Sequence, residues 1–342
     1  MRELIVPKKL KKGDTIAFIS ISGGRAGDPD MIRRYNLAKE RFEKEYEVHV
    51  VETPNALKGN DFIYKHPELR AEDLHWALTN PEISGIVCNQ GGDDSYRVLP
   101  YIDPEVIRSN PKVFMGFSDI ATWIAVFTCA GVRSYYGPCV LTPIGQPVKF
   151  DDYSKEAIRK AIFTGEVIGE VKPSESYTKI EWNDDINPKE IKWIKNDGYS
   201  VVQGEGKVSG RLYPICPGPV LQIMGTKYFP PADTFDGAIL AIEHGNGYPY
   251  DSALAGFHQM RTLAAAGVFD KAAAIMTGKM DDTSRNYLRK VINEEVHRED
   301  MVILENVDFV HRTPMTVLPT GVLCEIDCSG NKFSILEAGT RQ

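Results

Sequence analysis

The stretch that decides the fold runs from Lys112 to Trp123 and reads KVFMGFSDIATW. An apolar strand ends at Gly116, a short turn follows, and Ser118 stands directly before a helix that begins at Asp119. A serine in this position lies at the carboxyl edge of a parallel sheet. A tight strand-to-helix turn exposes its hydroxyl and lets the next N–H stabilise an oxyanion, although GFSD does not match G-x-S-x-G. Serine is also a favoured helix N-cap, so the motif alone leaves a structural role open.

The segments around this motif alternate between short apolar runs and amphipathic stretches over the first 140 residues or so. This alternation is typical of a mostly parallel sheet covered by helices, because consecutive parallel strands need helical crossovers. We therefore predict an α/β fold whose N-terminal domain has helices on both faces of a parallel sheet. The predicted strands are Thr15–Ser20, Val48–Glu52, Gly85–Asn89, Val113–Gly116 and Arg133–Tyr135, and the predicted helices are Pro29–Lys44, Arg70–Leu78 and Asp119–Thr128.

A second domain is expected after a long polar segment. From about residue 145 to 197 the periodicity decays, over a length that indicates a functional loop or an interdomain linker. We predict an N-terminal nucleophile domain over 1–165, a linker and substrate loop over 166–199, and a smaller β-rich α/β domain over 200–342. Its strands are predicted at Lys207–Leu212, Gly237–Ile242, Ala273–Thr277, Met301–Glu305 and Lys332–Leu336, and its helices at Ser252–Ala265 and Ser284–Val296.

The composition argues against several classes of protein. The 342 residues are 42% hydrophobic and 25% charged, and no apolar run approaches the length of a membrane span. The net charge of −7 is spread without a basic stripe, so no nucleic-acid partner is expected. The N-terminus lacks the apolar core of a secretory signal, and a cytoplasmic location is expected. The six cysteines suit reduced thiols and lack zinc-site spacing, so neither a metal nor another cofactor is predicted.

A second apolar strand ends in a pair of glycines. The run IVCNQGGDDSYRVLP leads through Gly91, Gly92 and Asp93 into a helical start. Adjacent glycines permit positive φ and a close approach of the backbone to a ligand, so a peptide N–H can point into the crevice that holds Ser118. A plain turn explains the same glycines. The run lacks the P-loop Lys-Ser/Thr and is too short for a dinucleotide fingerprint.

A serine nucleophile needs a base and a carboxylate that orients the base. His311 stands on a loop after the apolar segment VILENVDFV, and His244 in a Gly-rich loop is its one real rival among seven histidines. Glu243 ends the strand GAILAIE, where a buried carboxylate needs a partner such as an imidazolium. Neither Glu243 nor His311 can be placed beside Ser118 from periodicity or spacing, and structural or solvated roles stay open for both.

Together these motifs resemble the serine L,D-carboxypeptidase family, which includes murein tetrapeptide carboxypeptidases and microcin C resistance peptidases. The resemblance spans nearly the whole chain, from KKLKKGDTIAFIS through the glycine pair, GFSDIATW, the IE at Glu243 and AIMTGK to the His311 loop and LPTG. It implies a triad of Ser118, Glu243 and His311 between a parallel-sheet domain and a smaller β-rich domain. It also implies a homodimer and an oxyanion hole made by the backbone N–H groups of Asp119 and of one glycine of the pair, for which we choose Gly92.

The segment Ser174–Tyr199 bears on the substrate. It is similar to the extended loop of microcin C resistance enzymes, in which an aromatic ring stacks on the nucleobase of an aminoacyl-nucleotide. Trp182 is the candidate for this ring, because stacking needs a flat side chain and little sequence context. Gly91 and Asp93 are the other expected substrate contacts. Trp182 can instead anchor the loop, which is the role expected of Trp193.

The chain departs from the family in RLYPICPGPVLQIMGT, where Cys-Pro-Gly-Pro at 216–219 replaces a glycine-rich turn that borders the substrate. Three functions are therefore compared. The leading hypothesis is a serine peptidase that hydrolyses an amide bond in aminoacyl-nucleotide, microcin C-like compounds. The first alternative is an L,D-carboxypeptidase that releases the terminal D-alanine of a murein tetrapeptide. The second is an inert ligand-binding relative, against which the intact Ser118, Glu243 and His311 argue.

Overall fold

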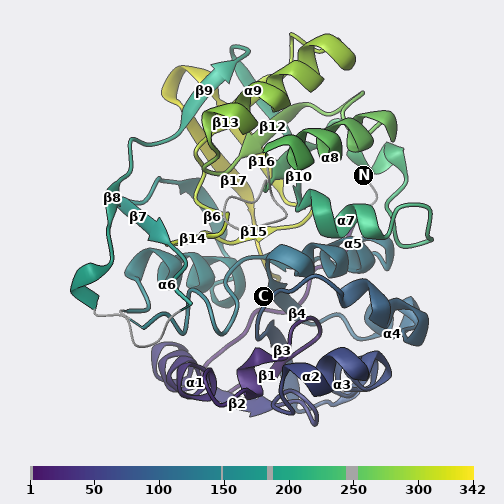
Figure 1. Ribbon diagram of the computed structural model, residues 1–342, viewed down its shortest axis with the longest axis vertical. Helices are drawn as coiled ribbons and strands as arrows, with labels where there is room; N and C mark the ends of the chain where they lie inside the picture. Colours follow the sequence, from purple (N-terminus) through teal and green to yellow (C-terminus); the bar gives the residue numbers. More distant parts are fainter. Residues whose placement is uncertain (1–2, 148, 183–187, 244–252) are drawn as a thin grey trace.

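The computed structural model describes residues 3–147, 149–182, 188–243 and 253–342, which form two main sheets (Figure 1). The first sheet carries the motif around Ser118. Five of its neighbouring strands are parallel, as predicted, and the sixth, at the edge, is antiparallel to its neighbour. In spatial order the strands are β15 (Leu318–Pro319), β5 (Tyr135–Tyr136), β4 (Val113–Gly116), β3 (Ile83–Cys88), β1 (Thr15–Ile19) and β2 (His49–Glu52).

Helices cover both faces of this sheet, as the alternating pattern predicted (Figure 1). In β1, Ile16 and Phe18 join the apolar cluster under the first helix, while Ala17 and Ile19 join the cluster on the opposite face. Strand side chains alternate between faces, so the continuous apolar run TIAFI is buried on both sides. One face carries α1 (Ile32–Tyr46) and α6 (Asp152–Ile158), and the other carries α3 (Pro67–Thr79), α4 (Pro104–Ser109) and α5 (Ala121–Cys129), with α2 (Asn60–Lys65) beside α3.

The second sheet has eight strands and is mixed. Its centre, β10 to β13, is parallel, and the outer strands pair antiparallel. A parallel-strand sheet in each half confirms the predicted α/β fold class. In spatial order the strands are β6 (Val167–Val171), β17 (Lys332–Ala338), β16 (Leu323–Asp327), β10 (Lys207–Ile215), β11 (Ile239–Ile242), β12 (Ala274–Thr277), β13 (Val302–Glu305) and β9 (Ser200–Gln203).

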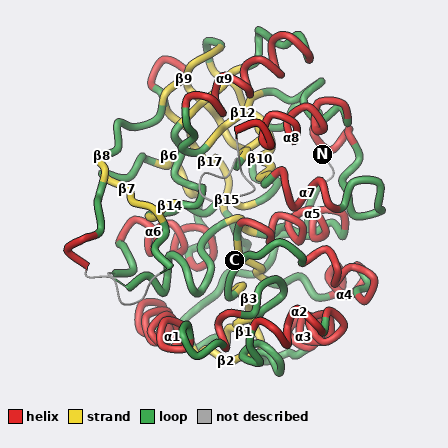
Figure 2. The backbone as a smooth tube through the Cα atoms, viewed as in Figure 1, coloured by secondary structure: helices red, strands yellow, loops and turns green. Residues whose placement is uncertain are grey.

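The helices of the second half are α7 (Pro217–Gln222), α8 (Ala253–Ala265) and α9 (Asp282–Lys290), and α9 continues as a π-helical turn over Val291–Glu295. Figure 2 shows α7 to α9 along one side of the second sheet, while α1 to α5 group around the first. The residues Cys-Pro-Gly-Pro at 216–219, where the sequence departs from the family, therefore form the N-cap and first turn of α7. The reason is that the fixed φ of proline suits the first helical position, which Pro217 occupies.

The segment predicted as linker and substrate loop contains regular structure. Its strand β6 joins the second sheet next to β17. A small third sheet, β14-β7-β8, lies at one side of the molecule, at the left in Figure 1. It is formed by β7 (Ser176–Lys179) and β8 (Ile194–Lys195) from this segment and by β14 (Arg312–Thr313), which begins directly after His311. The domain limits at 165 and 199 stay a prediction.

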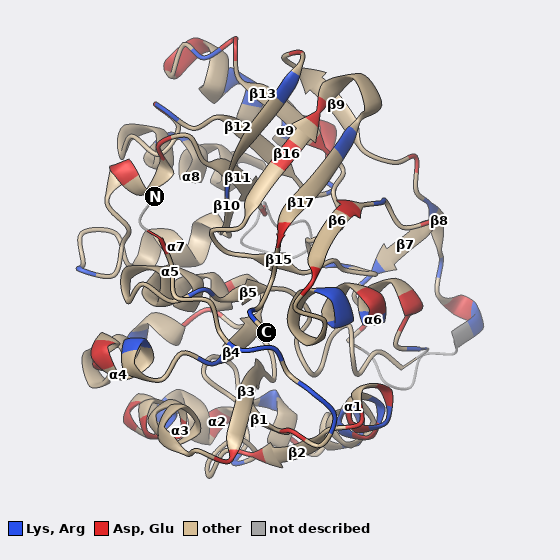
Figure 3. Cartoon of the chain, turned by 180° about the vertical axis from the view of Figure 1, so that it is seen from behind, with Lys and Arg blue, Asp and Glu red and all other residues tan. Residues whose placement is uncertain are grey.

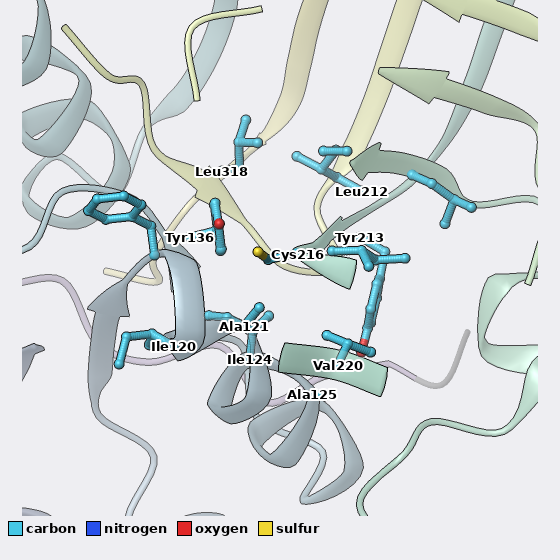
Figure 4. Close-up of a cluster of buried hydrophobic side chains, with 14 of the residues drawn as sticks. Ile120, Ala121, Ile124, Ala125, Tyr136, Leu212, Tyr213, Cys216, Val220 and Leu318 are labelled. Carbon is cyan, nitrogen blue, oxygen red and sulfur yellow. The ribbon is translucent and has the colours of Figure 1, made fainter. Parts of the chain in front are cut away.

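A continuous apolar core joins the two halves. Figure 4 shows Ala121, Ile124 and Tyr136 of the first half packed with Cys216 and Val220 of the second, and all five side chains are buried. Large buried apolar area of this kind holds the two sheets at a fixed position relative to each other. The carboxyl ends of β4 and β11, which carry Ser118 and Glu243, are thereby brought together.

The surface is charged in both signs. Figure 3 shows Lys and Arg interspersed with Asp and Glu over the helices and strands of the face seen there. Across the described ranges, we find no helix that combines the length and the apolar character needed to span a bilayer.

Candidate active site

Ser118 sits in a strained turn at the end of β4. Its φ is 65°, in the left-handed region that non-glycine residues seldom adopt. Phe117 before it is extended, and the 3-10 turn Ser118–Ile120 leads directly into α5. Backbone strain of this kind costs about 1–3 kcal/mol and gathers at functional sites. The sharp change of direction leaves the Ser118 side chain partly exposed at the sheet edge.

Ser118, His311 and Glu243 form one chain of hydrogen bonds. The Ser118 hydroxyl lies 3.0 Å from Nε2 of His311, and Nδ1 of the same ring lies 2.5 Å from Oε1 of Glu243. Glu243 is fully buried at the end of β11, whereas His311 keeps a side-chain exposure of 15%. With the ring proton on Nδ1, beside the carboxylate, Nε2 can accept the hydroxyl proton. His244, the rival base, falls outside the described residues.

Tyr136 provides a second hydrogen-bonded connection between Ser118 and Glu243. The sequence analysis did not predict this role. Its hydroxyl accepts a 2.9 Å hydrogen bond from the backbone N–H of Ser118 and donates to Oε2 of Glu243. Burial raises the pKa of Tyr136 well above its ordinary value, so the hydroxyl keeps its proton. A buried tyrosine hydroxyl needs a hydrogen-bond partner. That requirement is the one signal from which the sequence could have indicated a role for Tyr136. Both carboxylate oxygens of Glu243 are therefore hydrogen-bonded.

The glycine pair lies against Ser118. A β-carbon added to Gly91 would come within 2.7 Å of the Ser118 Cβ, and one added to Gly92 would come within 2.4 Å of the Ser22 hydroxyl. Real side chains do not tolerate such distances, so both positions require glycine for close packing. The structure thus brings the predicted oxyanion loop beside Ser118. Asp93 is exposed, and its carbonyl accepts a hydrogen bond from the side chain of Gln222.

The Asp119 side chain connects three loops of the site by hydrogen bonds. The sequence analysis did not predict this role. Its Oδ2 accepts hydrogen bonds from the Ser22 hydroxyl (2.5 Å) and from the backbone N–H of Ser95 (2.9 Å). Ser22 follows β1, Ser95 follows the glycine pair, and Asp119 follows Ser118. Oδ1 is buried and has no hydrogen-bond partner among the described residues, and burial raises the pKa of this carboxyl. The Asp119 side chain therefore holds these loops in position, in addition to the oxyanion role predicted for its backbone N–H.

Trp182 lies on the α1 side of the first half. Its ring packs against the apolar cluster there, and the guanidinium carbons of Arg25 and Arg34 lie 5.9 and 5.7 Å from the ring centroid. Arg34 also donates to the carbonyl of Glu181 (2.7 Å). Within the described part of the chain, no contact joins Trp182 to Ser118, His311 or Glu243. These contacts are those expected of a loop anchor, and they leave a nucleobase contact untested.

No group of three or more His, Cys, Asp or Glu side chains is placed to hold a metal ion, as far as the described ranges extend. All six cysteines are free thiols, and four of them are buried.

Models of the LD-carboxypeptidase N-terminal and C-terminal domains match residues 16–137 and 209–326, which include Ser118 and Glu243. The chain belongs to the LD-carboxypeptidase family. It is a hydrolase of the serine carboxypeptidase type, as the motif order had predicted.

Several members of this family are similar to the chain over nearly its full length. The microcin C7 self-immunity protein MccF of Escherichia coli is 28% identical over 345 residues, which cover 96% of this chain and 94% of the relative. A crystal structure of an MccF-like protein from Bacillus anthracis is 27% identical, with a TM-score of 0.86 over 97% of this chain and 99% of that one. An MccF-like protein from Streptococcus pneumoniae in complex with AMP is 26% identical, with a TM-score of 0.84 over 94% and 98%.

Proposed function

We propose that this LD-carboxypeptidase hydrolyses an amide bond in aminoacyl-nucleotide, microcin C-like compounds, with Ser118 as nucleophile, His311 as base and Glu243 as orienting carboxylate. The observation that carries the proposal is the unbroken hydrogen-bond chain from the Ser118 hydroxyl through His311 to Glu243, with its 3.0 and 2.5 Å steps. Nucleophile, base and orienting group at such distances are the arrangement needed for acyl transfer.

In the proposed reaction the Ser118 oxygen attacks the carbonyl carbon of the amide, and His311 takes the hydroxyl proton. The oxyanion accepts hydrogen bonds from the backbone N–H groups of Asp119 and Gly92. His311 then gives its proton to the departing nitrogen, the C–N bond breaks, and an acyl group remains on Ser118. Water, deprotonated by His311, releases the acid. Glu243 stays ionised throughout and stabilises the imidazolium.

The nucleotide part of the proposal is supported by the relatives. The pneumococcal MccF-like protein is described with AMP, and the Escherichia coli relative is named for immunity to microcin C7. A murein tetrapeptide L,D-carboxypeptidase is the second candidate, and one observation favours it. The Trp182 ring lies against Arg25 and Arg34, contacts that suit a loop anchor better than a stacking platform. Pairing of the chain as a homodimer remains a prediction.

The experiment compares two substrates with two forms of the protein. An aminoacyl-adenosine phosphoramidate and a murein tetrapeptide are each incubated with the unchanged protein and with Ser118→Ala, and released amino acid is measured by mass spectrometry. We expect turnover of the phosphoramidate that Ser118→Ala abolishes. Release of D-alanine alone would support the murein alternative. Binding without turnover of either compound would identify an inert relative, and full turnover by Ser118→Ala would refute the assigned nucleophile.

A further inference from the structure

A cavity lies at the far end of β5 from the candidate triad. It has a volume of about 390 Å³, which is within the range of sites for small molecules. Its wall is formed by the N-terminal segment, by residues next to β5 and β15, and by parts of β10 and β17. Arg133 in this wall stands two residues before β5, whereas Tyr136 at the other end of the strand contacts Ser118 and Glu243. None of the three proposed triad residues is among the described residues of the wall.

The wall of this cavity carries more positive than negative charge. Three arginines contribute to it, Arg133, Arg211 and Arg341. The described wall contains two carboxylates, those of Glu3 and Glu337. Three positive and two negative charges leave an excess of one positive charge, in a chain whose net charge is −7. The cavity therefore differs in sign from the protein as a whole, which favours an anion as its ligand.

Glu337 is shared between two of these arginines. Both of its carboxylate oxygens lie 2.7 Å from Nη1 of Arg211, and Oε2 lies 3.5 Å from Nη2 of Arg133. Nε and Nη1 of Arg133 instead bind neutral carbonyls, among them those of Thr320 (3.1 Å) and Ala338 (2.9 Å). Burial lowers the pKa of Arg133, which means that its neighbours compensate the buried charge only in part.

Arg341, the third arginine, forms no ion pair with any described residue. Its Nε donates to the carbonyl of Val6 (3.0 Å), and the residue is exposed. A guanidinium has five N–H donors, so Arg341 retains donors that can turn toward a ligand in the cavity. One carboxylate therefore serves Arg133 and Arg211 together, and the charge of Arg341 is left without a partner in the described part of the chain.

Buried hydroxyl groups lie next to these arginines. Thr340 lines the cavity and is only 1% exposed, and its hydroxyl has no hydrogen-bond partner within the described ranges. The same is true of the hydroxyls of Ser134, which follows Arg133, and of Thr320, whose carbonyl accepts from Arg133. Buried polar groups are normally hydrogen-bonded, and each exception needs an explanation. An oxygen atom of a ligand in the cavity would give the Thr340 hydroxyl its acceptor.

We propose that this cavity binds a small molecule through a phosphate or carboxylate group that contacts Arg133, Arg341 and the Thr340 hydroxyl. The planar guanidinium matches both kinds of oxyanion, and a hydroxyl can donate to either. Such a ligand would balance the excess of positive charge at the point where the N-terminal segment, β5, β10 and β17 meet. It would bind apart from the substrate of Ser118, so the site does not depend on the proposed reaction.

The test measures binding of inorganic phosphate and of malonate by titration calorimetry, at an ionic strength held constant with sodium chloride. The variants are Arg341→Gln, at an exposed residue, and Thr340→Val, which removes a hydroxyl without a partner among the described residues. Without ligand, neither variant should have a lower melting temperature. The matched controls are Arg261→Gln, at an exposed arginine of α8, and Thr277→Val, which removes a similarly buried hydroxyl of β12. Both control residues lie outside the wall of the cavity.

We expect the unchanged protein to bind at least one of the two anions, and the one that binds more tightly identifies the group that the site prefers. Each variant should weaken this binding about tenfold or more, because a charge-assisted hydrogen bond is lost. The two controls should retain it, and the melting temperature of the unchanged protein should rise with the concentration of the anion. Binding of neither anion, undiminished binding in either variant, or an equal loss in the controls would overturn the proposal.

Discussion

The backbone N–H of Ser118 donates a 2.9 Å hydrogen bond to the hydroxyl of Tyr136. That hydroxyl donates in turn to Glu243. One side chain therefore holds both the turn at Ser118 and the buried carboxylate of Glu243. Tyr136 itself is fully buried. We therefore expect it to act by positioning Ser118 and Glu243.

Substitution Tyr136→Phe should lower kcat by about 10- to 100-fold with little change in KM. The reason is that Glu243 loses a hydrogen-bond donor and the strained Ser118 loses the acceptor of its N–H, and hydrogen bonds to charged groups contribute about 1.5–3 kcal/mol. Steady-state kinetics and the rate of Ser118 labelling by a fluorophosphonate measure the effect.

Tyr135→Phe is the matched control for this substitution. The Tyr135 hydroxyl is also buried, but it donates to the carbonyl of Gly339, on the opposite side of the strand. Both variants should lose about 1 kcal/mol or more of unfolding free energy. Equal losses of kcat in the two variants would show that Tyr136 matters only for packing.

Asp119→Ala should lower kcat about 100-fold and leave KM nearly unchanged. Without the carboxylate, Ser22 and Ser95 lose the acceptor that holds the glycine loop against Ser118, and a displaced oxyanion donor costs about 10²- to 10³-fold in kcat. Ser22→Ala, which removes one of the two bonds, should have a smaller effect. Steady-state kinetics on both variants tests this order.

Asp73→Ala separates positioning from stability. Asp73 is another buried carboxyl, and it accepts hydrogen bonds from the Thr53 hydroxyl (2.6 Å) and from Asn55, away from the site. Its loss should reduce the melting temperature as much as that of Asp119 while kcat stays unchanged. A similar fall of kcat in both variants would contradict the positioning role.

The free energy of unfolding should depend on pH through the protonation of Asp119. Burial raises the pKa of its carboxyl, so the folded protein retains a proton that the unfolded chain loses above about pH 4. The stability that this group contributes is therefore complete below that pH and decreases as the pH rises toward the folded pKa. Urea unfolding should show the protein losing stability relative to Asp119→Asn as the pH rises above about 4. If the protein instead gains stability relative to Asp119→Asn as the pH rises, the folded state favours the ionised carboxylate of Asp119.

Trp182→Ala distinguishes the two substrate hypotheses. Loss of a stacked base costs about 1–3 kcal/mol, so binding of an aminoacyl-adenylate analogue should weaken by roughly 10- to 100-fold while cleavage of a peptide without a base changes little. Trp193→Ala is the control, because Trp193 is partly exposed and its ring contacts Lys149. Equal impairment of both substrates together with a lower melting temperature would identify Trp182 as a loop anchor.

Much of the first sheet and the place of Ser118 could be predicted, because strand, turn and helix start are local signals. β4 was predicted with its observed bounds, and Ser118 stands at its end as expected. The partners of Ser118 are different, since His311 lies 193 residues further along the chain and Glu243 is 68 residues before His311. No periodicity extends over such separations, and only the resemblance linked them.

Tyr136 and the side chain of Asp119 were missed for a physical reason. Two consecutive tyrosines in an apolar strand indicate core packing, and nothing local shows that one hydroxyl faces a carboxylate from the other half. Asp119 in the first turn after Ser118 suggests a capping residue, yet its acceptor bonds go to Ser22 and Ser95 on other loops. The departure at 216–219 left its local structure open, because proline and glycine favour turns as well as first helical positions.

The edge strand β15 has a consequence for how the protein is made. Leu318 lies opposite Tyr136 in the pairing of β15 with β5, so the sheet that carries Ser118 is finished by residues synthesised long after it. Domains fold as they emerge during translation, from the N-terminus onward. While the ribosome is still adding the second half, Ser118 lacks His311, its proposed base, and the sheet lacks the edge strand β15. With the proposed triad, we therefore expect the nascent chain to be inert toward amide bonds until translation has passed Pro319.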